Sequence, residues 1–142
     1  MTGATRFGAR VGEAAASFRC AACGEVAALV KAVPAEVPAD MGPPQGAQAH
    51  RRDGIVVDYF GGTKWQAAEP EIYAGVRAIL DVDEPDAAEL RRIDWELAPF
   101  YCPECDQAYC LADWHTYIVF DEGFYDCTIG TCPAGHRHTV DD

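Results

Sequence analysis

The chain has 142 residues, a length typical of one globular domain, and its apolar fraction of 49% is enough to build a core. Its formal net charge of -12 argues against a protein held to nucleic acid by phosphate contacts, because that mode of binding needs a basic surface. No stretch approaches the roughly 18 consecutive apolar residues of a membrane span, and the first residues hold no apolar signal segment. We therefore expect one domain over residues 1–142 that is cytoplasmic and binds neither nucleic acid nor membrane.

The acidic charge is concentrated in the second half of the chain. Residues 1–64 contain seven Lys and Arg against six Asp and Glu, whereas residues 65–142 contain four against seventeen. Such an excess most simply keeps a protein soluble, but it also suits a partner with a basic surface.

The first third of the chain predicts two strands and a long loop. Residues 1–16 are small and polar and are expected to be flexible. Residues 17–20 and the apolar run 26–33 predict two strands joined by a tight turn. Residues 34–50 are rich in proline and glycine without usable periodicity, which is typical of a loop.

Aromatic residues gather around the next predicted strand. Residues 55–60 are β-branched and aromatic and predict a strand, which the pair Gly61-Gly62 ends. Tyr59, Phe60 and Trp65 flank that pair. We assign them to ordinary core packing, with a groove for a small molecule or a peptide as the alternative.

Two helices and a hairpin complete the predicted elements. Residues 70–80 place apolar side chains on one face of a helix. Residues 86–97 predict a second helix, which Asp86 caps at its N-terminus and Pro99 stops. Residues 117–127 predict a β-hairpin. The predicted fold class is α+β: small antiparallel hairpins with one or two helices, organised around the metal sites considered next.

Seven cysteines carry the strongest chemical signal, because six of them fall into three short clusters. A Cys-x-x-Cys turn points both sulfurs at one ion, and the glycine after the first pair suits a backbone position with positive φ. Zinc takes four such ligands in a tetrahedron, so each pair needs a second pair from elsewhere, and four pairs predict two zinc ions. The clusters are Cys20-x2-Cys23-Gly24, Cys102-x2-Cys105 with Cys110, and Cys132 with His136.

Other uses of the cysteines fit the sequence less well. A disulfide framework needs an oxidising compartment, and the odd number of cysteines speaks against it. A redox pair of the thioredoxin type needs only one Cys-x-x-Cys, at a strand-to-helix junction. Iron in a sulfur-only site of the two Cys-x-x-Cys pairs remains an alternative metal. Cys127 has neighbours that alternate as in a strand, so we assign it to packing.

The run Cys102-x2-Cys105-x4-Cys110-x2-Asp113, followed by His115, resembles the middle of a B-box finger. More broadly, it is similar to cross-brace and treble-clef zinc fingers, including RING and AN1 types, over about 40 C-terminal residues and the first cysteine pair. In those fingers the ligand pairs interleave. The resemblance therefore implies one site of Cys20, Cys23, Cys110 and either Asp113 or His115, and a second of Cys102, Cys105, Cys132 and His136.

This sequence departs from those fingers in one respect and leaves one ligand open. Between Cys23 and Cys102 lie 78 residues, far more than those families place there, so residues 51–98 are expected to form an insert between ligand pairs. Asp113 has the family spacing, whereas His115 is of the commoner zinc-binding type. We favour Asp113.

No motif indicates a reaction. The His-x-Glu of zinc deaminases and the His-Glu-x-x-His helix of zincins are both absent, and eight good ligands for two ions indicate closed structural sites. We expect a structural-zinc protein-interaction module. The alternatives are a small zinc enzyme with an open site around His115 or Asp113, and an acidic decoy or immunity-type binder of a basic protein. His138 is expected to be solvated or to support a metal ligand.

Overall fold

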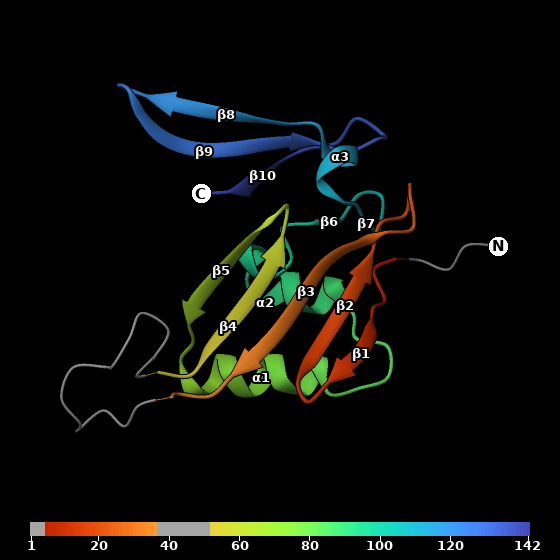
Figure 1. Cartoon of the computed structure of the whole chain (residues 1–142), viewed down its shortest axis with the longest axis vertical. Helices are drawn as coiled ribbons and strands as arrows, with labels where there is room; N and C mark the ends of the chain where they lie inside the picture. Colours follow the sequence, from red (N-terminus) through yellow and green to blue (C-terminus); the bar gives the residue numbers. More distant parts are fainter. Residues whose placement is uncertain (1–4, 37–51) are drawn as a thin grey trace.

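The computed structural model describes residues 5–36 and 52–142, which form ten strands in three antiparallel sheets. The largest sheet is a five-stranded meander whose spatial order follows the chain (Figure 1). Each strand pairs with the next one along the sequence, so the connections between neighbours are direct. Its strands are β1 (Ala9–Gly12), β2 (Ala15–Arg19), β3 (Val26–Val33), β4 (Gly54–Tyr59) and β5 (Gly62–Ala67).

Helices α1 (Pro70–Leu80) and α2 (Ala87–Ile93) cover one face of this sheet (Figure 1). Strand alternation sends every second side chain of β2, β3 and β4 toward the helices, where these side chains form the main core. The core holds Phe18, Val30 and Ile55 from the sheet and Val76, Leu80 and Leu90 from the helices, all fully buried.

The helix over residues 70–80 is confirmed, and the helix predicted over 86–97 is confirmed in part. The side chain of Asp86 accepts a hydrogen bond from the N–H of Ala88, as expected of an N-cap. The helix ends at Ile93 because Asp94 caps a separate short 3-10 helix, η1 (Trp95–Leu97), by accepting from the N–H of Glu96. No helix in the described part of the chain is both long enough and apolar enough to span a bilayer.

The C-terminal third builds two smaller sheets beyond one end of the meander (Figure 1). Strands β8 (Thr116–Asp121), β9 (Phe124–Thr131) and β10 (Arg137–Asp141) form a three-stranded sheet in the order β10-β9-β8. The β8–β9 pair confirms the hairpin predicted over residues 117–127. Strands β6 (Tyr101–Cys102) and β7 (Gln107–Ala108) form a short hairpin, and the one-turn helix α3 (Leu111–Trp114) follows it.

Trp114 is the centre of a second core beneath the three-stranded sheet. Its side chain is fully buried, and its indole N–H donates to the carbonyl oxygen of Phe100 over 2.9 Å. Tyr109 meets the indole edge-on. The sheet approaches so closely at Gly130 that a Cβ there would lie 3.0 Å from the indole ring. The small residue in β9 therefore lets the sheet rest directly on Trp114.

The α+β fold class predicted from the sequence is wrong. The described residues are mostly antiparallel sheet with few helices, and they are not small hairpins beside one or two helices. The reason is that several strands carry no clear apolar alternation. Strands β1 and β5 are largely exposed, while β6 and β7 have two residues each, so their existence depends on their pairing partners and not on local preference.

Part of the segment 1–16, expected to be flexible, has regular structure, and residues 1–4 lie outside the described residues. From Ala9 to Gly12 it forms β1, Phe7 bridges to Asp86, and Ala16 is fully buried in β2. The small residues Ala14 and Ala16, which the sequence analysis placed in a flexible segment, are buried in the main core. Most of the loop expected over residues 34–50 lies outside the described residues. The stretch considered an insert supplies β4, β5, α1 and α2, which belong to the main sheet and its cover.

Candidate metal centres

The first cysteine pair lies in the tight turn between β2 and β3. The N–H of Cys20 donates to the carbonyl of Glu25 over 2.7 Å, and the N–H of Gly24 donates to the carbonyl of Cys20 over 2.9 Å. Gly24 has a φ of 80°, in the left-handed region that glycine adopts without strain. The role predicted for this glycine is confirmed, and the turn holds Cys20 and Cys23 beside each other.

Helix α3 brings the second half of this cluster into place. Cys110 is its N-cap, and its carbonyl accepts from the N–H groups of Asp113 and Trp114 over 3.1 Å each. One helical turn returns Asp113 to Cys110, with the carboxylate Oδ2 3.2 Å from the Cys110 sulfur. The same oxygen lies 3.0 Å from the sulfur of Cys20, and the sulfurs of Cys23 and Cys110 are 3.7 Å apart. We name the group Cys20, Cys23, Cys110 and Asp113 site 1.

His115 does not join site 1. It ends α3 in the left-handed conformation with a φ of 40°, and its side chain is exposed. Its carbonyl accepts from the N–H of Thr131, which ties the backbone to β9. Hydrogen bonds from the thiols of Cys20 and Cys110 lower the pKa of Asp113, so its carboxylate stays charged beside the sulfurs. The geometry therefore favours Asp113 over His115, and metal binding by either residue stays a prediction.

The second cluster joins two turns, one from the β6–β7 hairpin and one between β9 and β10. In the first turn the N–H of Asp106 donates to the carbonyl of Cys102 over 2.8 Å. In the second the N–H of Cys132 donates to the carbonyl of His136 over 2.8 Å, while the N–H of His136 donates to the Cys132 sulfur over 3.3 Å. Both turns thereby direct their side chains into one space.

Four ligand-type atoms meet in that space. His136 Nδ1 lies 3.2 Å from the Cys105 sulfur, 3.3 Å from that of Cys132 and 3.6 Å from that of Cys102. The sulfurs of Cys105 and Cys132 are 3.6 Å apart. Cys102 and Cys132 are buried, whereas Cys23 of site 1 is exposed, so the second cluster is the better shielded of the two. We name the group Cys102, Cys105, Cys132 and His136 site 2.

The thiols of the two sites differ in how readily they lose a proton. Burial, and then the hydrogen bond to Asp113, raises the pKa of Cys110 to about 12, and burial also raises the pKa of Cys102. Burial acts in the same direction on Cys132, but hydrogen bonds from the backbone N–H groups of His136 and Ala134 and from the side chains of Cys105 and His136 together outweigh it and bring the pKa down to about 7. Cys132 is thus the thiol most ready to act as a thiolate ligand.

A carboxylate and an imidazole lie against site 2. His138 Nε2 and Glu104 Oε2 are 2.6 Å apart, and the same carboxylate oxygen lies 3.4 Å from the Cys102 sulfur. His138 also meets Trp114 edge-on, so its ring is held from two sides. The sequence expected His138 to be solvated or to support a ligand, but it gave no role to Glu104, although this residue stands inside the Cys102-Pro-Glu-Cys105 turn.

Some of the sequence alternatives are not assembled. The two Cys-x-x-Cys pairs belong to different sites, so the sulfur-only iron site is not formed. The Cys23 and Cys110 sulfurs of site 1 are 3.7 Å apart, and the Cys105 and Cys132 sulfurs of site 2 are 3.6 Å apart. A disulfide bond measures about 2.05 Å, so neither pair is bonded, and all seven cysteines are free thiols. Cys127 lies in β9, outside both sites.

Fold and sites together define an antiparallel-β protein with two cysteine-rich clusters that could hold metal ions. The family model described as "Domain of unknown function (DUF8328)" matches residues 9–142, and the chain belongs to this family. No curated protein and no solved structure matches the chain. The family match identifies no zinc finger, so the likeness to B-box and RING fingers is limited to ligand spacing.

Proposed function

We propose that the protein is a structural-zinc protein-interaction module that binds one zinc ion in site 1 and one in site 2. The observation that carries the proposal is the gathering of eight ligand-type side chains into two groups of four. Site 1 connects the β2–β3 turn of the large sheet to α3, and site 2 connects the β6–β7 turn to the β9–β10 turn. An ion in site 1 would fasten α3 to the large sheet, and an ion in site 2 would fasten the two small sheets to each other.

The spacing of the ligand atoms supports zinc. In a tetrahedron with Zn–S bonds of about 2.3 Å, neighbouring sulfurs are separated by about 3.8 Å, and a sulfur and an imidazole nitrogen by about 3.6 Å. The sulfur pairs at 3.6 and 3.7 Å agree with the first value. The three sulfur–nitrogen distances of site 2, from 3.2 to 3.6 Å, approach the second. Magnesium and calcium prefer oxygen ligands, so three sulfurs per site argue against them.

Ligand number supports a structural role over catalysis. Structural zinc has four protein ligands, whereas catalytic zinc has three and keeps one position for water or substrate. Each site offers four protein donors. An open site around His115 or Asp113 is the enzyme alternative, and cobalt substitution separates the two. Four-coordinate spectra without exchangeable water, with three sulfurs and one oxygen at site 1 and three sulfurs and one nitrogen at site 2, support the module. A bound water at either ion supports the enzyme.

The free cysteines support a reducing cellular compartment, and the acidic charge supports a basic protein partner. Seven free cysteines are suited to a reducing compartment such as the cytoplasm. The seventeen acidic residues against four basic ones after residue 64 favour a protein partner with a basic surface.

Elemental analysis of the purified full chain tests the proposal directly. We expect close to two zinc ions per chain. Removal of both ions by a chelator should abolish the near-UV circular dichroism of Trp114, because the ions hold the elements around it. A content near one ion would restrict the proposal to a single site. A content near zero, with disulfide bonds found by mass spectrometry, would overturn it.

A further inference from the structure

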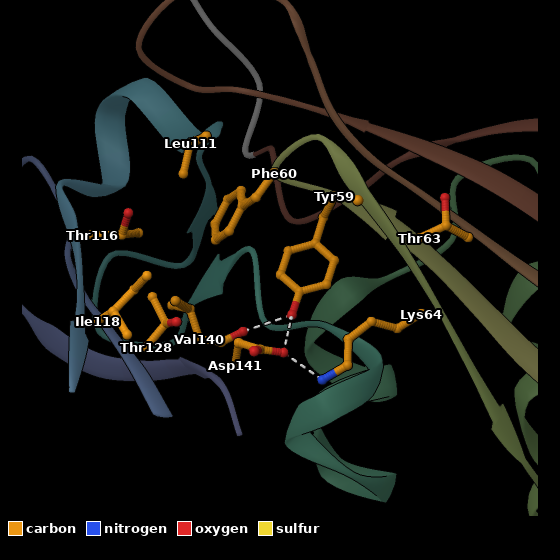
Figure 2. Close-up of a pocket in the computed structure, with 11 residues that line it drawn as sticks. Tyr59, Phe60, Thr63, Lys64, Leu111, Thr116, Ile118, Thr128, Val140 and Asp141 are labelled. Carbon is orange, nitrogen blue, oxygen red and sulfur yellow. Dashed lines mark hydrogen bonds and ion pairs between the residues drawn. The ribbon is translucent and has the colours of Figure 1, made fainter. Parts of the chain in front are cut away.

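A groove of about 450 Å³ separates the end of the β4–β5 hairpin from the three-stranded sheet (Figure 2). Tyr59 and Phe60 line it from the large sheet, and Leu111 from α3. Ile118 of β8 and Val140 of β10 line it from the small sheet. The lining is therefore mainly apolar although the groove is open to solvent. The aromatics that the sequence analysis assigned to the core are in part the floor of this groove.

The floor is held in place by polar contacts at one end. The hydroxyl of Tyr59 donates to the carbonyl of Val140 over 2.8 Å and also contacts the carboxylate of Asp141 (Figure 2). Lys64 forms an ion pair with Asp141, and the hydroxyl of Tyr125 donates to the same carboxylate. The contacts of Tyr59 and Lys64 join the two sheets across the groove, so its shape is set before anything binds.

Strand β8 adds an exposed apolar edge to the groove. It is the outer strand of its sheet, and within the described residues no strand pairs with its free side. Ile118 lines the groove and is 55% exposed, and Phe120 further along the same strand is 65% exposed. Leu111 and Tyr125 continue this surface, each at 45%. An open strand edge beside exposed apolar side chains is the arrangement that binds an extended peptide by strand addition.

Charge selects among the possible occupants. From residue 111 to residue 142 the chain carries six Asp and Glu against a single Arg. That residue, Arg137, lies over the ring of Tyr117, and Lys64 is paired with Asp141. A second copy of the chain would bring acidic residues against acidic residues, which opposes pairing through β8. A segment carrying Lys or Arg is attracted to the same surface.

We propose that the β8 edge and the groove bind an extended segment of a partner protein, with apolar side chains in the groove and Lys or Arg side chains flanking them. The segment lies beside β8 as a fourth strand, and its alternate side chains contact Phe60, Leu111 and Ile118. This inference rests on the proposed function as an interaction module and names the chemistry of its partner. None of the residues of site 1 or site 2 lines the groove.

Fluorescence anisotropy with a labelled synthetic peptide of alternating Lys and Val tests the proposal on the zinc-loaded full chain. We expect saturable binding that weakens as salt is added. Ile118→Ser should weaken it about tenfold or more, because the apolar contact is lost. Ile72→Ser removes an isoleucine that is 38% exposed on α1, away from the groove, and should bind the peptide as the unaltered chain does.

Several outcomes would overturn the proposal. Equal binding by Ile118→Ser and the unaltered chain would show that attraction is a general charge effect. Undiminished binding of a peptide methylated on alternate backbone nitrogens would exclude strand addition. A concentration-dependent dimer that Ile118→Ser abolishes would assign the surface to a second copy. Zinc content measured on the same samples keeps the two proposals apart. Two ions without peptide binding overturns this inference alone, while absence of zinc counts against the proposed function.

Discussion

The fourth ligand of site 1 is the sharpest test of the metal assignment. Asp113 Oδ2 lies within 3.2 Å of two cysteine sulfurs, whereas the exposed His115 lies outside the cluster. We expect Asp113→Ala to weaken zinc binding at site 1 and His115→Ala to leave it unchanged. The two substitutions are matched, because the residues are two apart in sequence at the end of one short helix.

The size of the effect follows from the ligand count. Structural zinc binds with about 10–16 kcal/mol at neutral pH, so an equal share for each of four ligands is about 3 kcal/mol. A loss of about 3 kcal/mol corresponds to a dissociation constant on the order of 100-fold higher. Water replaces the carboxylate in part, so the shift should be at this value or somewhat below it.

Competition with a chromophoric chelator measures the shift, and native mass spectrometry counts the ions that remain. Site 2 should keep its ion in both variants and serves as the internal reference. If His115→Ala loses one ion while Asp113→Ala keeps both, the assignment of Asp113 is wrong and site 1 has three cysteines and a histidine. Asp113→Asn would then bind zinc as tightly as the unaltered chain.

Three further perturbations address site 2 and the core beside it. Cys102→Ser should release one zinc ion and unfold much of the C-terminal part, whereas Cys127→Ser should retain both ions. Equal metal loss from the two variants would contradict the assignment of Cys127 to packing in β9. Trp114→Ala should lower the free energy of unfolding by about 3–5 kcal/mol in urea denaturation, since it empties a fully buried site and removes one of the two hydrogen bonds that the carbonyl of Phe100 accepts. His138→Ala should raise the zinc dissociation constant of site 2 by about 10–100-fold without changing the ion count, because the imidazole lies beside Cys102 but outside the group of four; an unchanged constant would show that His138 does not support the site.

Local features of the fold could be predicted from the sequence because their determinants lie within a few residues. The apolar spacing over residues 70–80 is sufficient to specify α1. Asp86 signals the start of α2 in the same way. Asp94 carried the same signal before η1, and the longer apolar spacing concealed it. In each case the information needed is contained in one helical turn.

Strand β5 shows what local patterns cannot supply. Its sequence, GTKWQA, is polar and mostly exposed, and it exists as a strand because it pairs with β4. Trp65 lies over Gly54, where a Cβ would collide with the indole, so a glycine in one strand accommodates a large ring in the next. The pairing of β4 with β5 depends on both strands, so it cannot be predicted from the sequence of either strand alone.

The candidate metal sites likewise combine local features that the sequence predicts with long-range contacts that it does not. Each Cys-x-x-Cys turn and the Cys132–His136 turn is local and was expected from spacing. How the pairs combine depends on the fold, because Cys20 and Cys110 belong to different parts of it and meet only when the β2–β3 turn lies against α3. Glu104 was overlooked because its partner, His138, is 34 residues away.

The different sequence separations of the ligand pairs favour the formation of site 2 before site 1 during folding. Cys105 and Cys132 are 27 residues apart, whereas Cys23 and Cys110 are 87 residues apart. Closing the longer loop costs about 1 kcal/mol more chain entropy than closing the shorter one. Site 2 is made entirely from residues after β5 and α2, so it can assemble while the large sheet is still incomplete. Site 1 can form only when the N-terminal hairpin and α3 are in contact. Binding of an ion at site 1 would therefore depend on correct packing of the N-terminal part of the chain against the C-terminal part.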